Sequence, residues 1–354
     1  MSEHQGADQA TKRVVTQQDV ADRAGVSRAV VSYVVNNGPR VVLPETQARV
    51  LQAIEELGYR PNKYAQGLKL QASEQATGQI GILLGGTVDI LHRPYYSLLL
   101  AGIYRETHRQ NQQIRLVTFI DELKDPVFFN QNIHPEVISG LLLIGSETMV
   151  NDPDWPALYE RMTNRVANVV SLEHAFADVP AVLFDRVAAA QIAVQHLIDL
   201  GHTNIGYAGF PDERYQGYRQ KLLEHGLVEP AHFTLDGHVH TPEHGYHTTC
   251  ALLDLPEPPT ALLASADEVA LGVLAALRDR GLNSPQDVAI VSIDDLPFAS
   301  MIRPALTTVH VPKESFGIYA LQMLAMREAN PDVIPASVVL PVELIVRKSC
   351  GTQR

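Results

Sequence analysis

Cysteine, tryptophan and long apolar runs are scarce in this 354-residue sequence, which has two cysteines and one tryptophan. Cys250 and Cys350 have no disulfide-framework spacing, which is typical of a reducing compartment. No stretch reaches the ~18 to 20 uninterrupted apolar residues of a membrane span. The first 13 residues are polar, so we expect no signal peptide. These absences favour a cytoplasmic protein over membrane or secreted classes.

Common catalytic motifs are absent as well. There is no GxGxxG fingerprint, no GxxxxGK phosphate loop and no GxSxG nucleophile turn. A metal is suggested only by a group of five histidines, but their stretch is punctuated by Gly and Pro and lacks Cys and HExxH: His232, His238, His240, His244 and His247. We therefore predict no metal, no cofactor and no catalysis.

The net charge of −12 is distributed unevenly along the chain. Residues 1–70 hold nine Lys and Arg against seven Asp and Glu, a balance of +2 that leaves −14 for the remainder. This asymmetry favours a polyanionic partner for the N-terminal part. Because the excess is modest, DNA binding would need two copies of the chain, or neutral donors as well.

The stretch from Thr16 to Asn37 predicts two short helices joined by a tight turn at Gly25. Thr16 and Ser27 are typical N-cap residues, and Gly25 suits the left-handed position that ends a helix. Each helix has one apolar stripe, which describes a helix-turn-helix. The alternative is any pair of small amphipathic helices. In a helix-turn-helix the second helix would present outward Arg28, Ala29, Ser32, Tyr33 and Asn36.

The remainder of the chain predicts two further helices, and from residue 80 the spacing of apolar residues changes to that of buried strands. A third helix is expected over 44–57, then a short helix from Pro61 to Leu68 and a polar linker to residue 79. Strands are expected at 80–84, 114–119, 140–144, 166–170, 181–184, 205–208, 261–264 and 288–293, with helices at 96–110, 187–200, 216–226 and 267–280. This alternation predicts a doubly wound α/β core with two parallel-sheet lobes, whose ligands bind at the carboxyl ends of the strands.

The N-terminal segment resembles the DNA-binding domain of the lactose-repressor (LacI) family. The matching residues are Asp19-Val20-Ala21, Ala24-Gly25-Val26-Ser27, Val31-Ser32, Asn36 and Leu57-Gly58-Tyr59-Arg60-Pro61-Asn62. The remainder is similar to that family's periplasmic-binding-protein-like core, on His196 to His202, Arg214 with Gly217-Tyr218-Arg219, Asp267, Ile293-Asp294-Asp295 and Glu343 to Arg347.

The resemblance implies four parts: a disordered tail (1–13), a helix-turn-helix domain (14–60), a hinge helix with linker (61–79) and a two-lobed effector-binding and dimerisation core (80–354). Lobe 1 would hold about 80–181 and 312–333, and lobe 2 about 182–311 and 334–354.

The resemblance also implies that Arg28 and Ala29 select the operator sequence. An arginine can bond guanine bidentately, and a small apolar side chain can contact a thymine methyl; a phosphate contact is the alternative for Arg28. Leu68 would wedge into a minor-groove base step, or else pack as an ordinary linker residue. The implied DNA-binding set is Thr16, Ser27, Arg28, Ala29, Ser32, Tyr33, Asn36, Asn62 and Leu68.

For the small-molecule effector, the resemblance implies a site made of Tyr95, Tyr96, Glu173, Arg214, Asp267 and Asp294. Charged groups and aromatic faces suit a carbohydrate or related polyol. Each carboxylate could instead cap a helix or form a hinge salt bridge. Arg93 and Ala266 replace asparagines usual in the family, so a changed or lost effector is an open alternative.

We therefore predict a cytoplasmic, nucleoid-associated transcriptional regulator without a membrane partner. It would bind palindromic double-stranded operator DNA as a homodimer, with a tetramer as an alternative, and repress transcription. Whether the effector induces or co-represses depends on the state it prefers. Two other classes were weighed: an enzyme with an appended DNA module, for which no activated nucleophile is found, and a solute-binding protein, which would lack residues 14–69.

Overall fold

A computed structural model describes residues 15–36, 42–60, 78–176, 178–230, 240–330, 332 and 336–351. The predicted tail, the predicted hinge helix with Asn62 and Leu68, and two of the five histidines, His232 and His238, lie outside these residues. The chain divides into two compact units: Met1–Thr87 with Thr107–Ser171 and Leu324–Val333, and Val88–Glu106 with Leu172–Met323 and Ile334–Arg354. Across the described ranges, no helix combines the length and apolar character needed to span a membrane.

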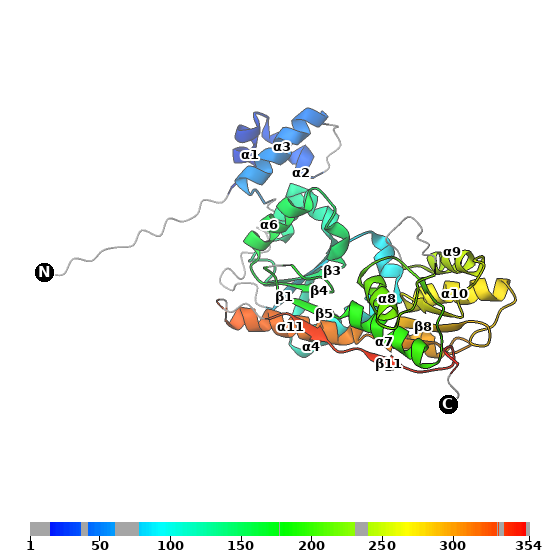
Figure 1. Cartoon of the computed structure of the whole chain (residues 1–354). Coiled ribbons are helices and arrows are strands. Elements are labelled where there is room, and N and C mark those ends of the chain that lie inside the picture. Colours follow the sequence, from blue (N-terminus) through cyan, green and yellow to red (C-terminus); the bar gives the residue numbers. More distant parts are fainter. Residues whose placement is uncertain are drawn as a thin grey trace. The chain divides into compact units, whose positions relative to one another are not determined.

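Three helices form the N-terminal bundle: α1 (Gln17–Ala24), α2 (Arg28–Val35) and α3 (Pro44–Leu57), drawn in blue in Figure 1. They bury a common apolar core made of Val20, Ala21, Ala24, Val31, Val50, Ala53, Ile54 and Tyr59. Gly25 ends α1 with a φ of +65°, a conformation that L side chains rarely adopt, and so sets the tight turn into α2. The predicted helix-turn-helix is confirmed.

The two predicted N-caps differ in the structure. Thr16 accepts from the Asp19 amide at 3.3 Å, and Asp19 Oδ2 accepts from the Thr16 amide at 2.7 Å, which completes a capping box. Ser27 occupies the N-cap position of α2, but its hydroxyl makes no capping hydrogen bond. The prediction from Ser27 was therefore right about where α2 begins and wrong about the bond.

Two sheets form the rest of the molecule. The six-stranded sheet has the spatial order β10 (Val338–Leu340), β5 (Ala181–Phe184), β4 (Val169–Leu172), β3 (Gly140–Ile144), β1 (Gln79–Leu84) and β2 (Gln113–Phe119). The five-stranded sheet has the order β11 (Glu343–Ile345), β9 (Thr307–His310), β8 (Ala289–Asp294), β7 (Ala261–Ala264) and β6 (Ile205–Ala208). In the parallel register, Ile82 of β1 lies opposite Val117 of β2 and Leu142 of β3.

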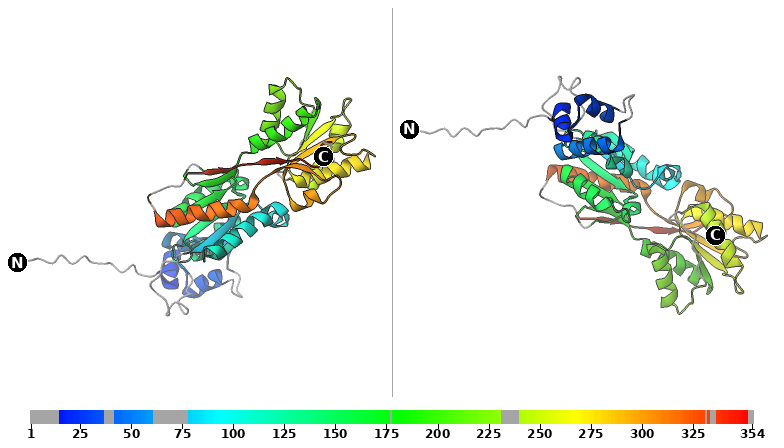
Figure 2. Two further views of the ribbon diagram at one scale, coloured as in Figure 1. Left: turned by 90° about the horizontal axis from the view of Figure 1, so that it is seen from below. Right: turned by 90° about the horizontal axis from the view of Figure 1, so that it is seen from above.

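The helices of this core are α4 (Pro94–Arg109), α5 (Pro126–Asn132), α6 (Trp155–Arg165), α7 (Arg186–Asp199), α8 (Glu213–Glu224), α9 (Pro242–Leu253), α10 (Asp267–Asp279) and α11 (Lys313–Ala329). Short 3-10 helices occur at Val88–His92, Ile120–Lys124, Ser146–Met149 and Pro297–Ser300. On the five-stranded sheet, α7 and α8 cover one face and α9 and α10 the other (Figure 2). Because both faces are covered, β6, β7 and β8 are buried along their whole length.

The predicted fold class is confirmed, with one difference of detail. β11 runs antiparallel to β9, whereas the remaining paired strands of that sheet run parallel. A three-residue edge strand such as β11 carries too short a pattern to reveal its direction from sequence.

Candidate functional site

The N-terminal end of α2 presents the side chains predicted to read bases. Arg28 and Ala29 are exposed, Asn36 is exposed at the other end, and Ser32 and Tyr33 are half-buried. Arg28 Nε donates to Gln17 Oε1 of α1 at 3.4 Å. Among the described residues this is the one hydrogen bond of the Arg28 side chain, so Nη1 and Nη2 have no hydrogen bond there.

Other members of the predicted DNA-binding set have their polar groups engaged within the bundle. The Thr16 hydroxyl donates to Asp19 Oδ2 at 2.7 Å, and the Asn36 amide donates to Ser32 O at 2.9 Å. The first bond joins the two side chains of the capping box that begins α1, and the second lies at the C-terminal end of α2, so both also have a structural role.

The six residues predicted to bind an effector lie at the carboxyl ends of strands, and each is at most 7% exposed. Tyr95 and Tyr96 begin α4, Glu173 directly follows β4, Arg214 lies in the first turn of α8, Asp267 begins α10 and Asp294 ends β8. Glu173 follows a strand of the six-stranded sheet, whereas Arg214, Asp267 and Asp294 follow or end strands of the five-stranded sheet. Ligands of doubly wound sheets bind at such carboxyl ends.

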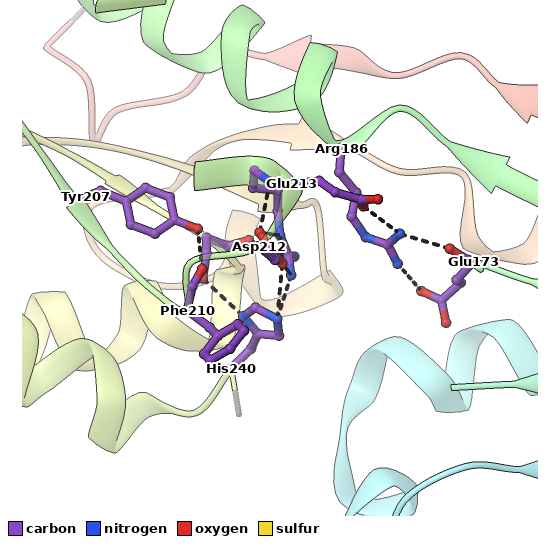
Figure 3. A network of polar contacts seen from close by, with 9 residues as sticks. Glu173, Arg186, Tyr207, Phe210, Asp212, Glu213 and His240 are labelled. Carbon is purple, nitrogen blue, oxygen red and sulfur yellow. Dashed lines mark hydrogen bonds and ion pairs between the residues drawn. The ribbon is translucent and has the colours of Figure 1, made fainter. Parts of the chain in front are cut away.

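Arg214 is the centre of a buried polar network, whose members Asp212 and His240 are labelled in Figure 3. Its Nε donates to Asp212 Oδ2 at 2.9 Å, its Nη1 to the Ser265 carbonyl at 3.0 Å, and its Nη2 contacts His240 Nε2 at 2.5 Å. The other ring nitrogen of His240 lies 3.1 Å from Ser265 Oγ. Because a guanidinium has no acceptor, His240 Nε2 must accept and carries no proton.

The electrostatics agree with this assignment. Burial, and then the Arg214 charge, hold the pKa of His240 well below its ordinary value. Burial alone would raise the pKa of Asp212, but the charge and hydrogen bonds of Arg214 lower it to about 2. Burial alone would lower the pKa of the Arg214 guanidinium. The charge and hydrogen bonds of Asp212 outweigh burial, so the pKa of Arg214 is raised. The network therefore holds a permanent cation beside a neutral imidazole.

Glu173 is held by a second arginine. Arg186 Nη1 donates to the Glu173 carbonyl at 2.9 Å, its Nη2 lies 3.7 Å from Glu173 Oε1, and its Nη1 lies 3.3 Å from Glu213 Oε2 (Figure 3). Glu173 has a φ of +71°, which is uncommon for a residue with a side chain. Nearby, burial and then the charge of Glu173 raise the pKa of Tyr95 well above its ordinary value.

Asp267 is fully buried and its carboxylate is occupied by protein donors. It accepts from Thr308 Oγ1 at 2.7 Å, from the Leu296 amide at 2.6 Å and from Ser292 Oγ. Burial, and then the charge of Asp294, raise its pKa. These bonds tie the first turn of α10 to β8, β9 and the segment after β8, so Asp267 holds the strand ends that carry the site.

Sequence reasoning missed several charged partners in the site. Arg186 and Lys313 begin α7 and α11; Lys313 Nζ donates to the Asp294 carbonyl and, at 2.8 Å, to the Val311 carbonyl. Arg93 Nε donates to Glu268 Oε2 at 3.0 Å. Arg186 and Lys313 follow strands, which was an available signal. Arg93 was noted from the sequence only as a departure from the family, and its partner Glu268 is 175 residues away. His240 was considered only as a metal ligand, whereas its nitrogens contact Arg214 and Ser265.

A helix-turn-helix bundle followed by a two-sheet α/β core defines a DNA-binding transcriptional regulator. A family described as "Bacterial regulatory proteins, lacI family" matches residues 16–62, and one described as "Periplasmic binding protein-like domain" matches residues 194–350. Catabolite control protein A of Priestia megaterium is 33% identical over 343 residues, which cover 95% of this chain and 99% of that protein.

Two further comparisons agree. The ribose operon repressor of Escherichia coli strain K12 is 31% identical over 328 residues, covering 90% of this chain and 94% of that protein. The crystal structure of the lac repressor dimer bound to operator and the anti-inducer ONPF has a TM-score of 0.64 at 25% identity, covering 96% and 99% of the two chains. The chain belongs to the LacI family of transcriptional regulators, which confirms the predicted family and its non-enzymatic class.

Proposed function

We propose that this regulator binds a roughly palindromic operator as a homodimer in the cytoplasm and represses transcription. The observation that carries the proposal is the exposed end of α2, where Arg28 uses only Nε for a hydrogen bond among the described residues and Ala29 lies beside it. Such a pair suits a guanine and a thymine methyl on neighbouring base pairs. The lac repressor structure, a dimer on its operator, supports this assembly.

The DNA contacts fall into two groups by chemistry. Arg28 and Ala29 read bases, while side chains with donors position the protein on phosphates: Thr16, Ser27, Ser32, Tyr33 and Asn36. Asn62 and Leu68, which lie outside the described residues, complete the set as a hinge contact and a minor-groove wedge.

A small carbohydrate or related polyol controls the regulator from the strand-end site. Tyr95 and Tyr96 supply aromatic faces, with ring centroids 5.3 Å apart, and Arg214 and Glu173 supply charged groups for paired hydroxyls. Asp294 completes the ligand set, and Asp267 serves it by fixing the strand ends. The ribose operon repressor, named for a sugar operon, supports this ligand class.

Replacing Arg28 with alanine tests the DNA half of the proposal. The operator is first selected from random-sequence duplexes with the full chain, and dissociation constants are then measured by fluorescence anisotropy at one salt concentration. We expect Arg28→Ala to cost about 1–3 kcal/mol and to relax the preference at a single base pair.

The matched control is Arg23→Ala, an arginine of the same bundle that pairs with Glu56. It should leave base preference unchanged. A uniform loss of affinity over all operator sequences in Arg28→Ala would assign the residue to a phosphate and contradict base reading.

A further inference from the structure

We propose that Gln17 is the positioning residue for Arg28, holding its guanidinium by Nε so that Nη1 and Nη2 together face a guanine. This inference rests on the base-reading role proposed for Arg28. It adds a residue of α1 to the specificity machinery, although α1 is not the helix whose side chains are expected at base edges.

The geometry joins the starts of two helices. Gln17 is the first residue of α1 and Arg28 the first of α2, and Gln17 Oε1 accepts from Arg28 Nε at 3.4 Å across the turn. Gln17 is half-buried, whereas Arg28 is exposed. The amide thus lies between the interior of the bundle and the exposed reading residue.

The core residue Tyr59 lies near the Gln17 side chain. Tyr59 is 2% exposed and packs with the apolar residues of the bundle. Burial raises the pKa of its hydroxyl, while Gln17 and the charge of Arg28 oppose that rise. Gln17 is therefore close to a buried core residue as well as to Arg28.

Because Arg28 is held by a neutral glutamine at Nε, its remaining nitrogens and its charge are available to DNA. Because the guanidinium is planar, a bond at Nε fixes its orientation and leaves Nη1 and Nη2 as the pair that can bond guanine O6 and N7. Gln17 supplies an acceptor without a negative charge, so the cation stays available to DNA. Within the described residues Arg28 forms no ion pair, so glutamine orients the side chain without neutralising it.

Residues other than Gln17 hold the two ends of α1. The N-terminus of α1 is capped by Thr16 and Asp19, and the turn after α1 is set by Gly25. Losing the Gln17 oxygen therefore leaves the helix ends intact and frees the Arg28 side chain. Ordering a free arginine side chain on binding costs entropy. Arg28 should therefore discriminate between the cognate guanine and an altered base about three- to tenfold less well.

The test compares the full-length chain carrying Gln17→Leu, which removes the acceptor at similar size, with wild type. Dissociation constants are measured on the selected operator and on the same duplex with the Arg28-read guanine replaced by 7-deazaguanine, which lacks N7. We expect Gln17→Leu to reduce the ratio of the two constants about three- to tenfold, with binding to the substituted duplex unchanged.

The matched control is Gln52→Leu on α3, whose side chain donates to Glu56 at 3.0 Å. An equal loss on both duplexes, or an unchanged ratio in Gln17→Leu, overturns the positioning role. Arg28→Ala separates this role from base reading itself. If Arg28→Ala abolishes discrimination while Gln17→Leu keeps it, only the positioning role fails. If Arg28→Ala also keeps discrimination, base reading by Arg28 fails first. Thermal melts by circular dichroism confirm that each variant is folded.

Discussion

At the scale of single residues, the buried charges of the strand-end site are defined by their partners. Arg214 bonds Asp212, the Ser265 carbonyl and His240, so most of its donors are engaged by protein. A hydroxyl-bearing ligand must therefore use the remaining donor capacity of Arg214 or displace His240. This explains why an arginine can sit 7% exposed in the site without an uncompensated charge.

The neutral His240 predicts a pH dependence of stability. Its pKa in the folded protein is well below its ordinary value of about 6.5, because burial and the Arg214 charge outweigh the opposing charge of Asp212. The unfolded chain takes up a proton that the folded chain excludes, so this contribution to stability is present above about pH 6.5 and is lost as the pH falls. We expect a loss of about 1 kcal/mol between about pH 7.5 and about pH 5.5.

The measurement is urea unfolding at the two pH values for wild type and His240→Gln, since a glutamine oxygen can still accept from Arg214. The variant should lose less stability on acidification. His225→Gln, at an exposed histidine after α8, is the matched control and should behave like wild type. An undiminished loss in His240→Gln would mean that other groups cause the acid sensitivity.

At the scale of elements, α9 and α10 pack closely because each offers a glycine to the other. A Cβ on Gly272 would lie 1.8 Å from the Pro242 carbonyl oxygen, and one on Gly245 would lie 2.1 Å from the Val269 carbonyl oxygen. Figure 1 shows the two helices side by side. Because Asp267 begins α10, this packing also holds the strand-end site in place.

Gly272→Ala should therefore destabilise the protein by about 1–3 kcal/mol, the usual effect of overpacking. Thermal unfolding by circular dichroism measures it, with Arg278→Ala on the exposed face of α10 as the control. Alanine is favoured over glycine inside a helix by about 1 kcal/mol. A stabilised Gly272→Ala would thus show that the two backbones do not approach as closely as described.

Elements also differ in how well the sequence predicts them. The helix over 44–57 and the strands at 140–144, 181–184, 205–208 and 261–264 are observed with the predicted bounds, because apolar periods, caps and glycines are local signals. Helices α5, α6, α9 and α11 and strands β9, β10 and β11 were not predicted. β10 and β11 have only three residues, and β9 reads Thr-Thr-Val-His, so none of the three carries the continuous apolar run that marked the predicted strands.

At the scale of the whole molecule, the uneven charge and the proposed two-fold assembly act together. The balance of +2 in residues 1–70 is small for a DNA-binding segment, so one copy would hold DNA weakly. Two copies on a palindromic site double the contacts and make the second half-site contact intramolecular. The acidic remainder disfavours contact of the core with the DNA backbone.

We expect sedimentation equilibrium to give a mass of about 78 kDa for the full chain, twice the 38.9 kDa of one copy. An operator with two inverted half-sites should bind about a hundredfold more tightly than a duplex with one. A duplex with directly repeated half-sites is the control and should lose the gain. Equal affinity for one and two half-sites would contradict the symmetric dimer.

The sequence by itself determined the class of protein. Gly25, the Thr16 cap and the apolar stripes predict the helix-turn-helix, since these signals operate within a few positions along the chain. The six-residue effector site stays a prediction, made from the resemblance to the LacI family.

Only the tertiary structure decided which groups face one another. Arg93 bonds Glu268, 175 residues away, and Arg214 bonds the carbonyl of Ser265, 51 residues away. Such partners depend on strand order and helix packing, which bring together segments that carry no shared local pattern. For the same reason the contact between Gln17 and Arg28 emerges only once α1 and α2 are packed, although both residues stand in the predicted motif.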